Sequence, residues 1–327
     1  MSKDFEVNSR SDITVMVTGA AGFIGSHILD ALNTYGYSVL AVDGLIDSTY
    51  PSSIKRNRWN TYKETYQKNF RFFEGDLADR NFVQTLPAVN FVINLAALPG
   101  LMMSWTNLDL YLRSNVSVLN NLIEYSKFHK VTNFVHASTS SVYGEYAKCD
   151  EHGTKNPVSP YGITKLAAEN LILAHHHNFD FPYTILRYFS VYGPQKRSDM
   201  FYALAINRIM NNEKIEVFGN GEQTRSNTYV GEVAGATVQS LYLPKLRNGI
   251  FNVSGEEVVS VNEALRIIGK VLKITPDVVY LPKRPGDQFQ TLGDSSKIRS
   301  AGITLGKMTF EEGITLQIED ALSRRNN

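Results

Sequence analysis

A glycine-rich turn between an apolar run and an amphipathic segment, at residues 13–27, constrains the fold of this chain more than any other stretch. The β-branched and apolar run at 13–17 is typical of a buried strand, and the apolar residues after 22 recur at helical spacing. Between them, Gly19 permits a tight turn, Gly22 lets a pyrophosphate approach the backbone, and Gly25 lets the helix pack close to the strand. The turn and the helix N-terminus therefore predict an anion-binding site.

The next apolar run, at residues 38–42, extends this prediction to a dinucleotide. It ends at Asp43, near the spacing at which an acidic side chain meets a ribose hydroxyl in dinucleotide-binding folds. A carboxylate there favours NAD and repels a 2′-phosphate. We expect Gly19, Gly22, Phe23, Ile24 and Asp43 to contact the cofactor. The alternative is an ordinary strand-to-helix turn that binds nothing.

Composition and charge argue against several other functions. The chain has 327 residues and a net charge of +1, which argues against broad binding to nucleic acid or to a membrane surface. No apolar run reaches membrane-spanning length. The single cysteine, Cys149, allows no intramolecular disulfide and no cysteine metal cluster. Residues 1–11 are polar and are expected to fray. Because they lack the apolar core of a signal peptide, we predict a cytoplasmic protein.

No metal site is predicted at the three adjacent histidines, residues 175–177. Neighbouring side chains on a helix point about 100° apart, so the three imidazoles cannot all face one ion. They are expected to favour the negative end of the helix or to meet water.

Strands and helices alternate along the first part of the chain. Further strands are expected at 70–73, 89–95, 131–137 and 183–188, long helices at 108–128 and 160–178, and a short helix within 47–68. This order predicts an α/β fold of the Rossmann type, a doubly wound parallel sheet that binds ligands beyond the carboxyl ends of its strands. At that edge Asp76 could meet an adenine amino group beside Leu77, and the small side chains of Ala96 and Ala97 allow a flat cofactor to lie against the backbone.

The rest of the chain is expected to form a smaller α/β lobe that binds the substrate. Helices are predicted at 201–210 and 261–271 and a strand at 251–253, whereas 276–294 is expected to be loop. The cofactor-binding domain is therefore predicted to span 12–193, with a segment near 230–258 returning to it. Residues 194–229 and 259–322 are assigned to the substrate lobe.

Two stretches at the predicted carboxyl edge carry reactive side chains. Tyr161 and Lys165 are four residues apart at a helix start and share one face, and Thr139 lies at the end of a predicted strand. A free tyrosine has a pKa of ~10, and a nearby ammonium favours the phenolate; reaching ~7 takes roughly 4 kcal/mol. Tyr161 could then take a proton from an alcohol held by Thr139 while the carbon gives hydride to the cofactor. Alone, such a Tyr-Lys pair is usually solvated; the glycine turn favours the catalytic interpretation.

These segments together resemble the nucleotide-sugar epimerase/dehydratase group of the extended short-chain dehydrogenases. The resemblance covers roughly residues 13–322 and rests on the stretches at 18–25, 75–77, 96–97, 138–144, 161–165, 186–194 and 284–287. It implies tightly bound NAD, a nucleoside-diphosphate sugar as substrate, and oxidation at C4 of the hexose. It also implies a homodimer formed through the helices at 108–128 and 160–178, and a diphosphate held by Arg225 and Arg284.

The same resemblance favours epimerisation over other reactions. The 4,6-dehydratases of the group follow the threonine with Asp-Glu, and its decarboxylases usually carry Glu before Val-Tyr-Gly, whereas this chain has Ser140 and Ser141. Without a second acid–base pair, hydride most simply returns to the opposite face of C4. A dehydratase or decarboxylase that keeps the 4-keto product, and a regulator that only binds NAD, remain the alternatives.

Residues 190–200 are similar to the corresponding run of UDP-glucuronate 4-epimerases. By this resemblance Thr139, Ser190 and Arg197 would hold a uronate carboxylate, with Ser138 and Ser140 also in the substrate site. The chain departs from that subgroup at Met102, where Arg is common, and at Ser198 and residues 226–227. UDP-glucuronate is therefore the favoured substrate, and UDP-glucose and UDP-N-acetylglucosamine are the alternatives.

Overall fold

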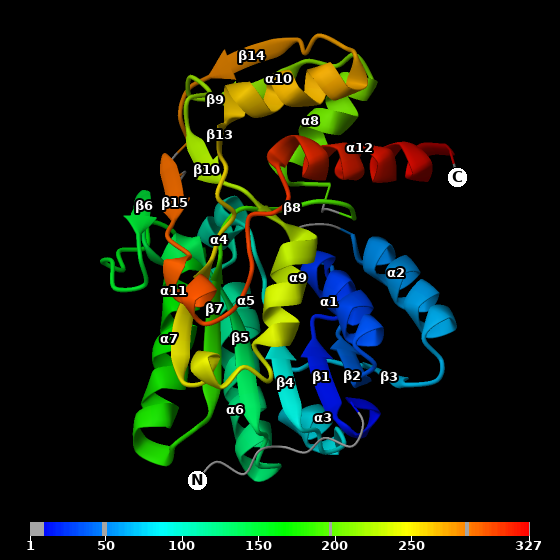
Figure 1. The fold of residues 1–327 in the computed structure, drawn as a ribbon, viewed down its shortest axis with the longest axis vertical. Helices are drawn as coiled ribbons and strands as arrows, with labels where there is room; N and C mark the ends of the chain where they lie inside the picture. Colours follow the sequence, from blue (N-terminus) through cyan, green and yellow to red (C-terminus); the bar gives the residue numbers. More distant parts are fainter. Residues whose placement is uncertain (1–9, 48–50, 196–197, 285–287, 327) are drawn as a thin grey trace.

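A seven-stranded parallel sheet forms the centre of the molecule (Figure 1). The structure, a computed structural model, describes residues 10–47, 51–195, 198–284 and 288–326. The strand order is β12-β7-β5-β4-β1-β2-β3. The bounds are Thr14–Thr18 for β1, Ser38–Asp43 for β2, Phe70–Glu74 for β3, Phe91–Asn94 for β4, Asn133–Thr139 for β5, Tyr183–Tyr188 for β7 and Gly249–Val253 for β12. The order reverses between β1 and β4, which is where open parallel sheets bind ligands.

Helices cover both faces of the sheet, which explains why inner strands such as β1 and β4 are buried along almost their whole length. On one face, Val15 and Val17 pack in the core that includes α1 (Phe23–Thr34) and α9 (Val230–Gln239). On the other, Met16 packs with α6 (Val118–Phe128) and α7 (Pro160–Phe179). The shorter helices α3 (Arg80–Thr85) and α11 (Ser296–Ser300) contribute to opposite faces in the same way. The predicted doubly wound parallel sheet is confirmed.

Two predicted helices differ from expectation. The segment 108–128 is not one regular helix: α5 (Leu108–Leu112) is followed by a π-helical turn at Arg113–Ser117 and then by α6. In the turn, the buried Asn115 amide accepts from the Leu98 amide N at 2.7 Å and donates to Thr164 Oγ1 at 3.0 Å. The widened turn thus ties this segment to α7 and to the loop after β4. Helix α2 (Ser52–Thr65) has 14 residues and is longer than predicted.

The smaller lobe, at the top of Figure 1, has its own core. It contains α8 (Phe201–Met210), α10 (Val261–Leu272), α12 (Phe310–Asn326) and the parallel pair β9 (Ile215–Phe218) and β14 (Val278–Leu281). The prediction that 276–294 is loop was wrong, because this segment holds β14 and β15 (Gln290–Gly293). Each strand has four residues and pairs with a partner far away in the chain, so the local pattern carried little signal.

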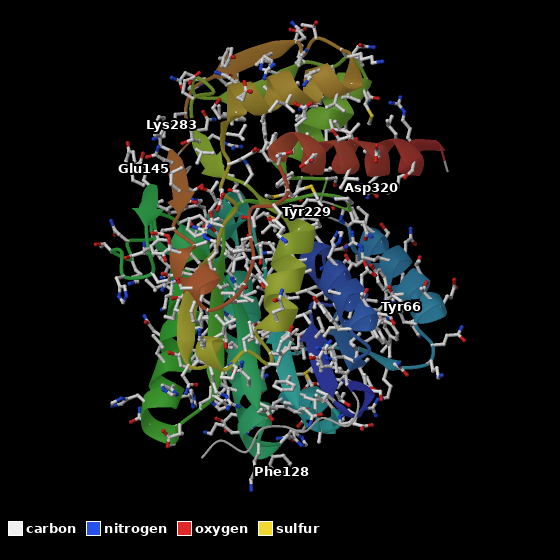
Figure 2. All side chains as sticks on the ribbon, in the orientation of Figure 1. Tyr66, Phe128, Glu145, Tyr229, Lys283 and Asp320 are labelled. Atoms are coloured by element: carbon white, nitrogen blue, oxygen red, sulfur yellow. The ribbon has the colours of Figure 1, made fainter. Side chains whose placement is uncertain are left out.

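Short strands connect the two parts of the molecule. A four-stranded sheet has the order β13-β10-β15-β6, with bounds Val258–Ser260, Thr224–Ser226, Gln290–Gly293 and Tyr146–Cys149, and β8 (Val191–Tyr192) pairs with β11 (Thr228–Tyr229). Lys283 Nζ lies 2.7 Å from Glu145 Oε1, close to β15 and β6 (Figure 2). Of the tail expected to fray, residues 1–9 lie outside the described residues, and Arg10–Asp12 form a 3-10 turn.

Candidate active site

The turn between β1 and α1 leaves no room for a side chain at its glycine positions. Gly19 has a φ of +68°, and a Cβ on it would lie 2.9 Å from the Ala96 amide N. A Cβ on Gly25 would lie 2.3 Å from the Gly19 carbonyl oxygen. Both contacts are with backbone, so a larger residue would force the turn to move. The turn is therefore a backbone cradle at a helix N-terminus, of the kind that binds phosphates.

Asp43, the last residue of β2, braces this turn. Its carboxylate is buried and accepts hydrogen bonds from the Ala21 amide N at 3.0 Å and from the Leu45 amide N at 2.9 Å. The acid thus lies at the carboxyl edge next to the glycines, where the sequence analysis expected a ribose hydroxyl to bind.

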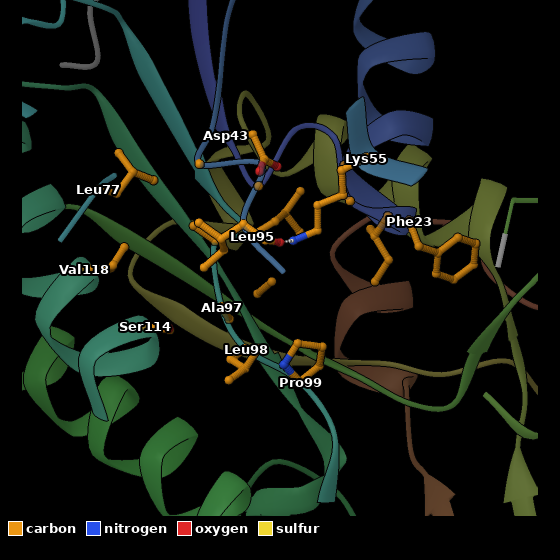
Figure 3. Close-up of a pocket in the computed structure, with 18 of the residues that line it drawn as sticks. Phe23, Asp43, Lys55, Leu77, Leu95, Ala97, Leu98, Pro99, Ser114 and Val118 are labelled. Carbon is orange, nitrogen blue, oxygen red and sulfur yellow. Dashed lines mark hydrogen bonds between the residues drawn. The ribbon is translucent and has the colours of Figure 1, made fainter. Parts of the chain in front are cut away.

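One pocket at this edge is lined by every residue that the sequence analysis assigned to the cofactor. Figure 3 shows part of this lining. Glycine and apolar positions come from the turn and from the strand ends, and Asp43 faces the space also bordered by Leu95 and Ala97. The predicted residues that line it are Gly19, Gly22, Phe23, Ile24, Asp43, Asp76, Leu77, Ala96, Ala97, Tyr161 and Lys165. A flat molecule bearing a diphosphate fits such a lining, because apolar walls flank the backbone cradle.

Three polar residues at the pocket were not predicted. Lys55 of α2 lines it and donates to the Ile46 carbonyl at 3.1 Å. Arg113, in the π-helical turn, forms an ion pair with Asp76, and Ser114 follows it in the lining. Their positions depend on how α2 and the π-helical turn pack, so no local sequence signal marked them.

Tyr161 and Lys165 enter the same pocket from the first turns of α7. Two residues stabilise the N-terminus of this helix. Ser159 Oγ caps it by accepting from the Gly162 amide N at 3.1 Å, and Pro160 occupies its first position. Lys165 is 3% exposed, and burial lowers its pKa to about 8 although Glu169 acts to raise it. The pKa of Lys165 thus lies closer to neutral pH than that of a free lysine. Because Lys165 is one helical turn from the Tyr161 phenol, this pKa suits proton exchange with an alcohol.

The end of β5 brings the predicted serines and threonine nearby. Ser138 lines the pocket, and its hydroxyl donates to the Glu169 carboxylate. Thr139 Oγ1 accepts from the Ser141 amide N at 3.2 Å, and the Ser140 carbonyl accepts from Gln288 Nε2 at 3.5 Å. In this state the hydroxyl of Ser138 is therefore committed to the protein, whereas its predicted role was in the substrate site.

A second pocket is lined by residues of the smaller lobe and of the short strands and loops that join it to the rest, and it contains three of the predicted substrate residues. Ser190, Arg225 and Arg284 line it. The Arg225 guanidinium donates to the backbone carbonyls of Gln288 and Thr224, and the Arg284 guanidinium lies 4.1 Å from the centre of the Phe218 ring. Arg197, which was also assigned to the substrate site, lies outside the described residues.

The lining of the second pocket also includes residues that the sequence analysis did not single out. Tyr202, Phe218, Gln223 and Phe289 are among them. The only sequence signal close to these residues is the Gly-Asn-Gly turn at 219–221, which directly follows β9. In the part of the chain that the structure describes, no three metal-ligating side chains gather, and no helix is long and apolar enough to cross a membrane.

Known proteins share both the sequence and this fold. Residues 15–254 match the model of the NAD dependent epimerase/dehydratase family. A UDP-glucuronate 4-epimerase of Thermodesulfobacterium geofontis is 33% identical over 305 residues, which are 91% of this chain and 93% of that protein.

Two solved structures are similar over nearly their whole length. A mutant of UDP-glucuronic acid 4-epimerase from Bacillus cereus, in complex with a fluorinated UDP-glucuronic acid and NAD, has a TM-score of 0.91 and 32% identity, covering 95% of this chain and 100% of that one. MoeE5 in complex with UDP-glucose and NAD has a TM-score of 0.84 and 36% identity, covering 96% and 99%. MoeE5 is also known with UDP-glucuronic acid. The family expected from the motifs is thus confirmed: the chain belongs to the NAD dependent epimerase/dehydratase family.

Proposed function

We propose that this protein is an NAD-dependent 4-epimerase of UDP-hexoses, with UDP-glucuronate as the favoured substrate. The observation that carries the proposal is that Tyr161 and Lys165 line the same pocket as the glycine turn and Asp43. A second pocket bearing Arg225 and Arg284 is formed partly by the smaller lobe. The first pocket thus offers residues for the cofactor and for an acid–base pair, and the second offers two arginines for a diphosphate. The roles given to these residues follow the resemblance to this family.

NAD, when bound, supplies the acceptor for the C4 hydride and gives the hydride back. The chain's own residues handle the proton and the orientation of the sugar. Tyr161 takes the proton from the C4 hydroxyl and later returns it, Thr139 holds that oxygen, and Lys165 favours the phenolate by its charge. Return of hydride to the other face requires the sugar ring to turn, so the diphosphate must be held more firmly than the sugar, a role for Arg225 and Arg284.

Two observations support a uronate as the sugar. The T. geofontis relative and the B. cereus neighbour are both UDP-glucuronate 4-epimerases, and residues 190–200 resemble that subgroup. Arg197 would then hold the carboxylate together with Ser190 and Thr139. MoeE5, known with UDP-glucuronic acid and with UDP-glucose, makes UDP-glucose the next substrate to test.

Proton NMR of the purified protein with UDP-glucuronate, without added NAD, tests the proposal. We expect a growing UDP-galacturonate signal in the wild type and a rate at least about a hundredfold lower in Tyr161→Phe. Tyr280→Phe, which removes an exposed hydroxyl bonded to Asn262, is the matched control and should be unaffected. A product with a 4-keto carbon or without its carboxylate would overturn the assignment, as would near-normal turnover in Tyr161→Phe.

The proposal includes a homodimer formed through the helices at 108–128 and 160–178. Leu108 and Leu112 of α5 and Ile163 of α7 are each more than 40% exposed, and α5 packs against α7. A second copy of this face would cover these apolar side chains. Light scattering should give the mass of two chains for the wild type and of one for Leu112→Glu, with Leu322→Glu on α12 as the exposed control; a monomeric wild type would contradict the proposal.

A cytoplasmic location is part of the same proposal. It rests on the sequence alone, because one cysteine offers no disulfide framework of the kind that secreted proteins use. Fractionation of source cells followed by immunoblotting tests it.

A further inference from the structure

A chain of buried polar side chains leads across three strands to Lys165. Thr18 Oγ1, at the end of β1, lies 2.8 Å from Asn94 Oδ1 at the end of β4. Asn94 Nδ2 lies 3.1 Å from His136 Nδ1 in β5, and His136 Nε2 lies 3.3 Å from Lys165 Nζ. All four residues are at most 3% exposed. The sequence analysis assigned no role to the first three.

His136 is the hydrogen-bond partner of Lys165 Nζ in the described part of the protein. Burial, and then the charge of Lys165, hold the pKa of His136 well below its ordinary value, so the imidazole is neutral. A neutral imidazole has one donor and one acceptor nitrogen, and Asn94 offers one of each to the other side of the ring. The ring can therefore meet Lys165 either as acceptor or as donor.

We propose that His136 is a positioning residue for the proposed epimerase reaction: it holds the Lys165 amine beside Tyr161 in both of the amine's protonation states. When Lys165 is an ammonium, His136 Nε2 accepts. The Asn94 amide is then rotated by 180° from the orientation in the structure, so that Nδ1–H donates to Asn94 Oδ1 and Asn94 Nδ2 donates to Thr18 Oγ1. When Lys165 is a neutral amine, each bond reverses: Thr18 donates to Asn94, Asn94 to Nδ1, and Nε2–H to the amine. In either state both nitrogens of the His136 ring and both polar atoms of the Asn94 amide keep a partner.

Other charged groups near Lys165 do not replace this contact. The carboxylate of Glu169, one helical turn further along α7, accepts two bonds from Arg187 of β7, at 2.6 and 2.9 Å, and one from Ser138. Among the described residues, the remaining titratable groups at this part of α7 are Tyr161 itself, Tyr111 of α5 and, on the same pocket, Asp43, Lys55, Asp76, Arg113 and Tyr188. With Glu169 already engaged, His136 decides where Nζ sits.

The test compares His136→Phe, which keeps a ring but loses both nitrogens, with His136→Gln, whose amide can reach the same point as donor or acceptor. Carbon-13 NMR of the lysine ε-carbons in NAD-free protein, with the Lys165 signal assigned from Lys165→Met, reports the Lys165 pKa directly. We expect His136→Phe to lower that pKa by about one unit, because the bond that the ammonium donates to Nε2 is charge-assisted and stronger than the bond that the neutral amine accepts, and His136→Gln to restore it. A Lys165 pKa unchanged in His136→Phe would overturn the proposal.

The kinetic arm rests on the proposed function and reads a different quantity. With less positive charge beside Tyr161, its phenolate is less favoured, so the acidic limb of the pH profile of kcat should move up by about one unit in His136→Phe and return in His136→Gln. A loss of kcat equal at every pH, with no rescue by Gln, would indicate a merely structural residue and also overturn the proposal. If the wild type turns over no UDP-hexose, the proposed function fails, and the NMR result still decides the role of His136.

A variant that does not fold is covered by a second one. Asn94→Ala removes the partner of His136 Nδ1 and leaves the ring in place, so it should move the Lys165 pKa in the same direction by a smaller amount. Thermal melts of all variants give the control for folding.

Discussion

Replacing Glu169 by Gln should destabilise the protein strongly, because it leaves the charge of Arg187 buried and unpaired. Arg187 Nη2 lies 2.6 Å from Glu169 Oε2 and Nε lies 2.9 Å from Oε1, so the pair is bidentate, and each side chain is 1% exposed. Burial opposes the charge on Arg187, but the hydrogen bonds and the charge of Glu169 outweigh it and raise the Arg187 pKa. Gln keeps the shape and removes the counter-charge.

The size of the effect follows from the burial of both partners. Removing one partner of a fully buried ion pair costs about 3–5 kcal/mol. With an unfolding entropy of about 2.1 cal/mol/K per residue, 327 residues give about 0.7 kcal/mol/K near the melting temperature. The melting temperature of Glu169→Gln should therefore fall by about 4–7 °C.

Scanning calorimetry of two variants checks this value. Glu311→Gln is the matched control, because Glu311 Oε1 lies 2.7 Å from Lys270 Nζ in a pair whose side chains are 47% and 59% exposed. An exposed pair contributes at most about 1 kcal/mol, so this control should melt within about 1.5 °C of the wild type. Combining Glu169→Leu with Arg187→Met should recover part of the loss, since neither charge of this pair is then left buried without its partner. The reasoning is refuted if Glu169→Gln and Glu311→Gln shift the melting temperature equally.

Two further predictions concern the cofactor pocket. The pKa of Lys165 is about 8 in the folded chain and ~10.4 when unfolded, so between these pH values the unfolded chain binds more protons and the free energy of unfolding rises with pH. Urea titrations at pH 8 and pH 10 should show this rise in the wild type and a smaller rise in Lys165→Met. An identical rise in both proteins would contradict the buried amine. Asp43→Asn should weaken NADH binding about tenfold and narrow the preference for NADH over NADPH, because the carboxylate that repels a 2′-phosphate is gone. Fluorescence titration with both nucleotides measures the two affinities. An unchanged ratio of these affinities would count against the role of Asp43.

The central sheet could be predicted because its signals are local. A parallel strand buried on both faces is a continuous apolar run, and the glycines at 19, 22 and 25 mark a turn in which added Cβ atoms meet backbone. The spacing of Tyr161 and Lys165 likewise places both on one face of a helix that begins at Pro160. These features depend on residues only a few positions apart, and every predicted cofactor residue lines one pocket.

Tertiary structure alone decided the rest, because those contacts join distant segments. The four-stranded sheet at the junction takes strands of three or four residues from 146–149, 224–226, 258–260 and 290–293, and none of them is long enough to declare itself by periodicity. The approach of His136 to Lys165 depends on the register of β5 against β4 and on how α7 packs against the sheet. A sequence pattern records which face a side chain takes on its own element, whereas the partner across the interface is chosen only when the elements pack.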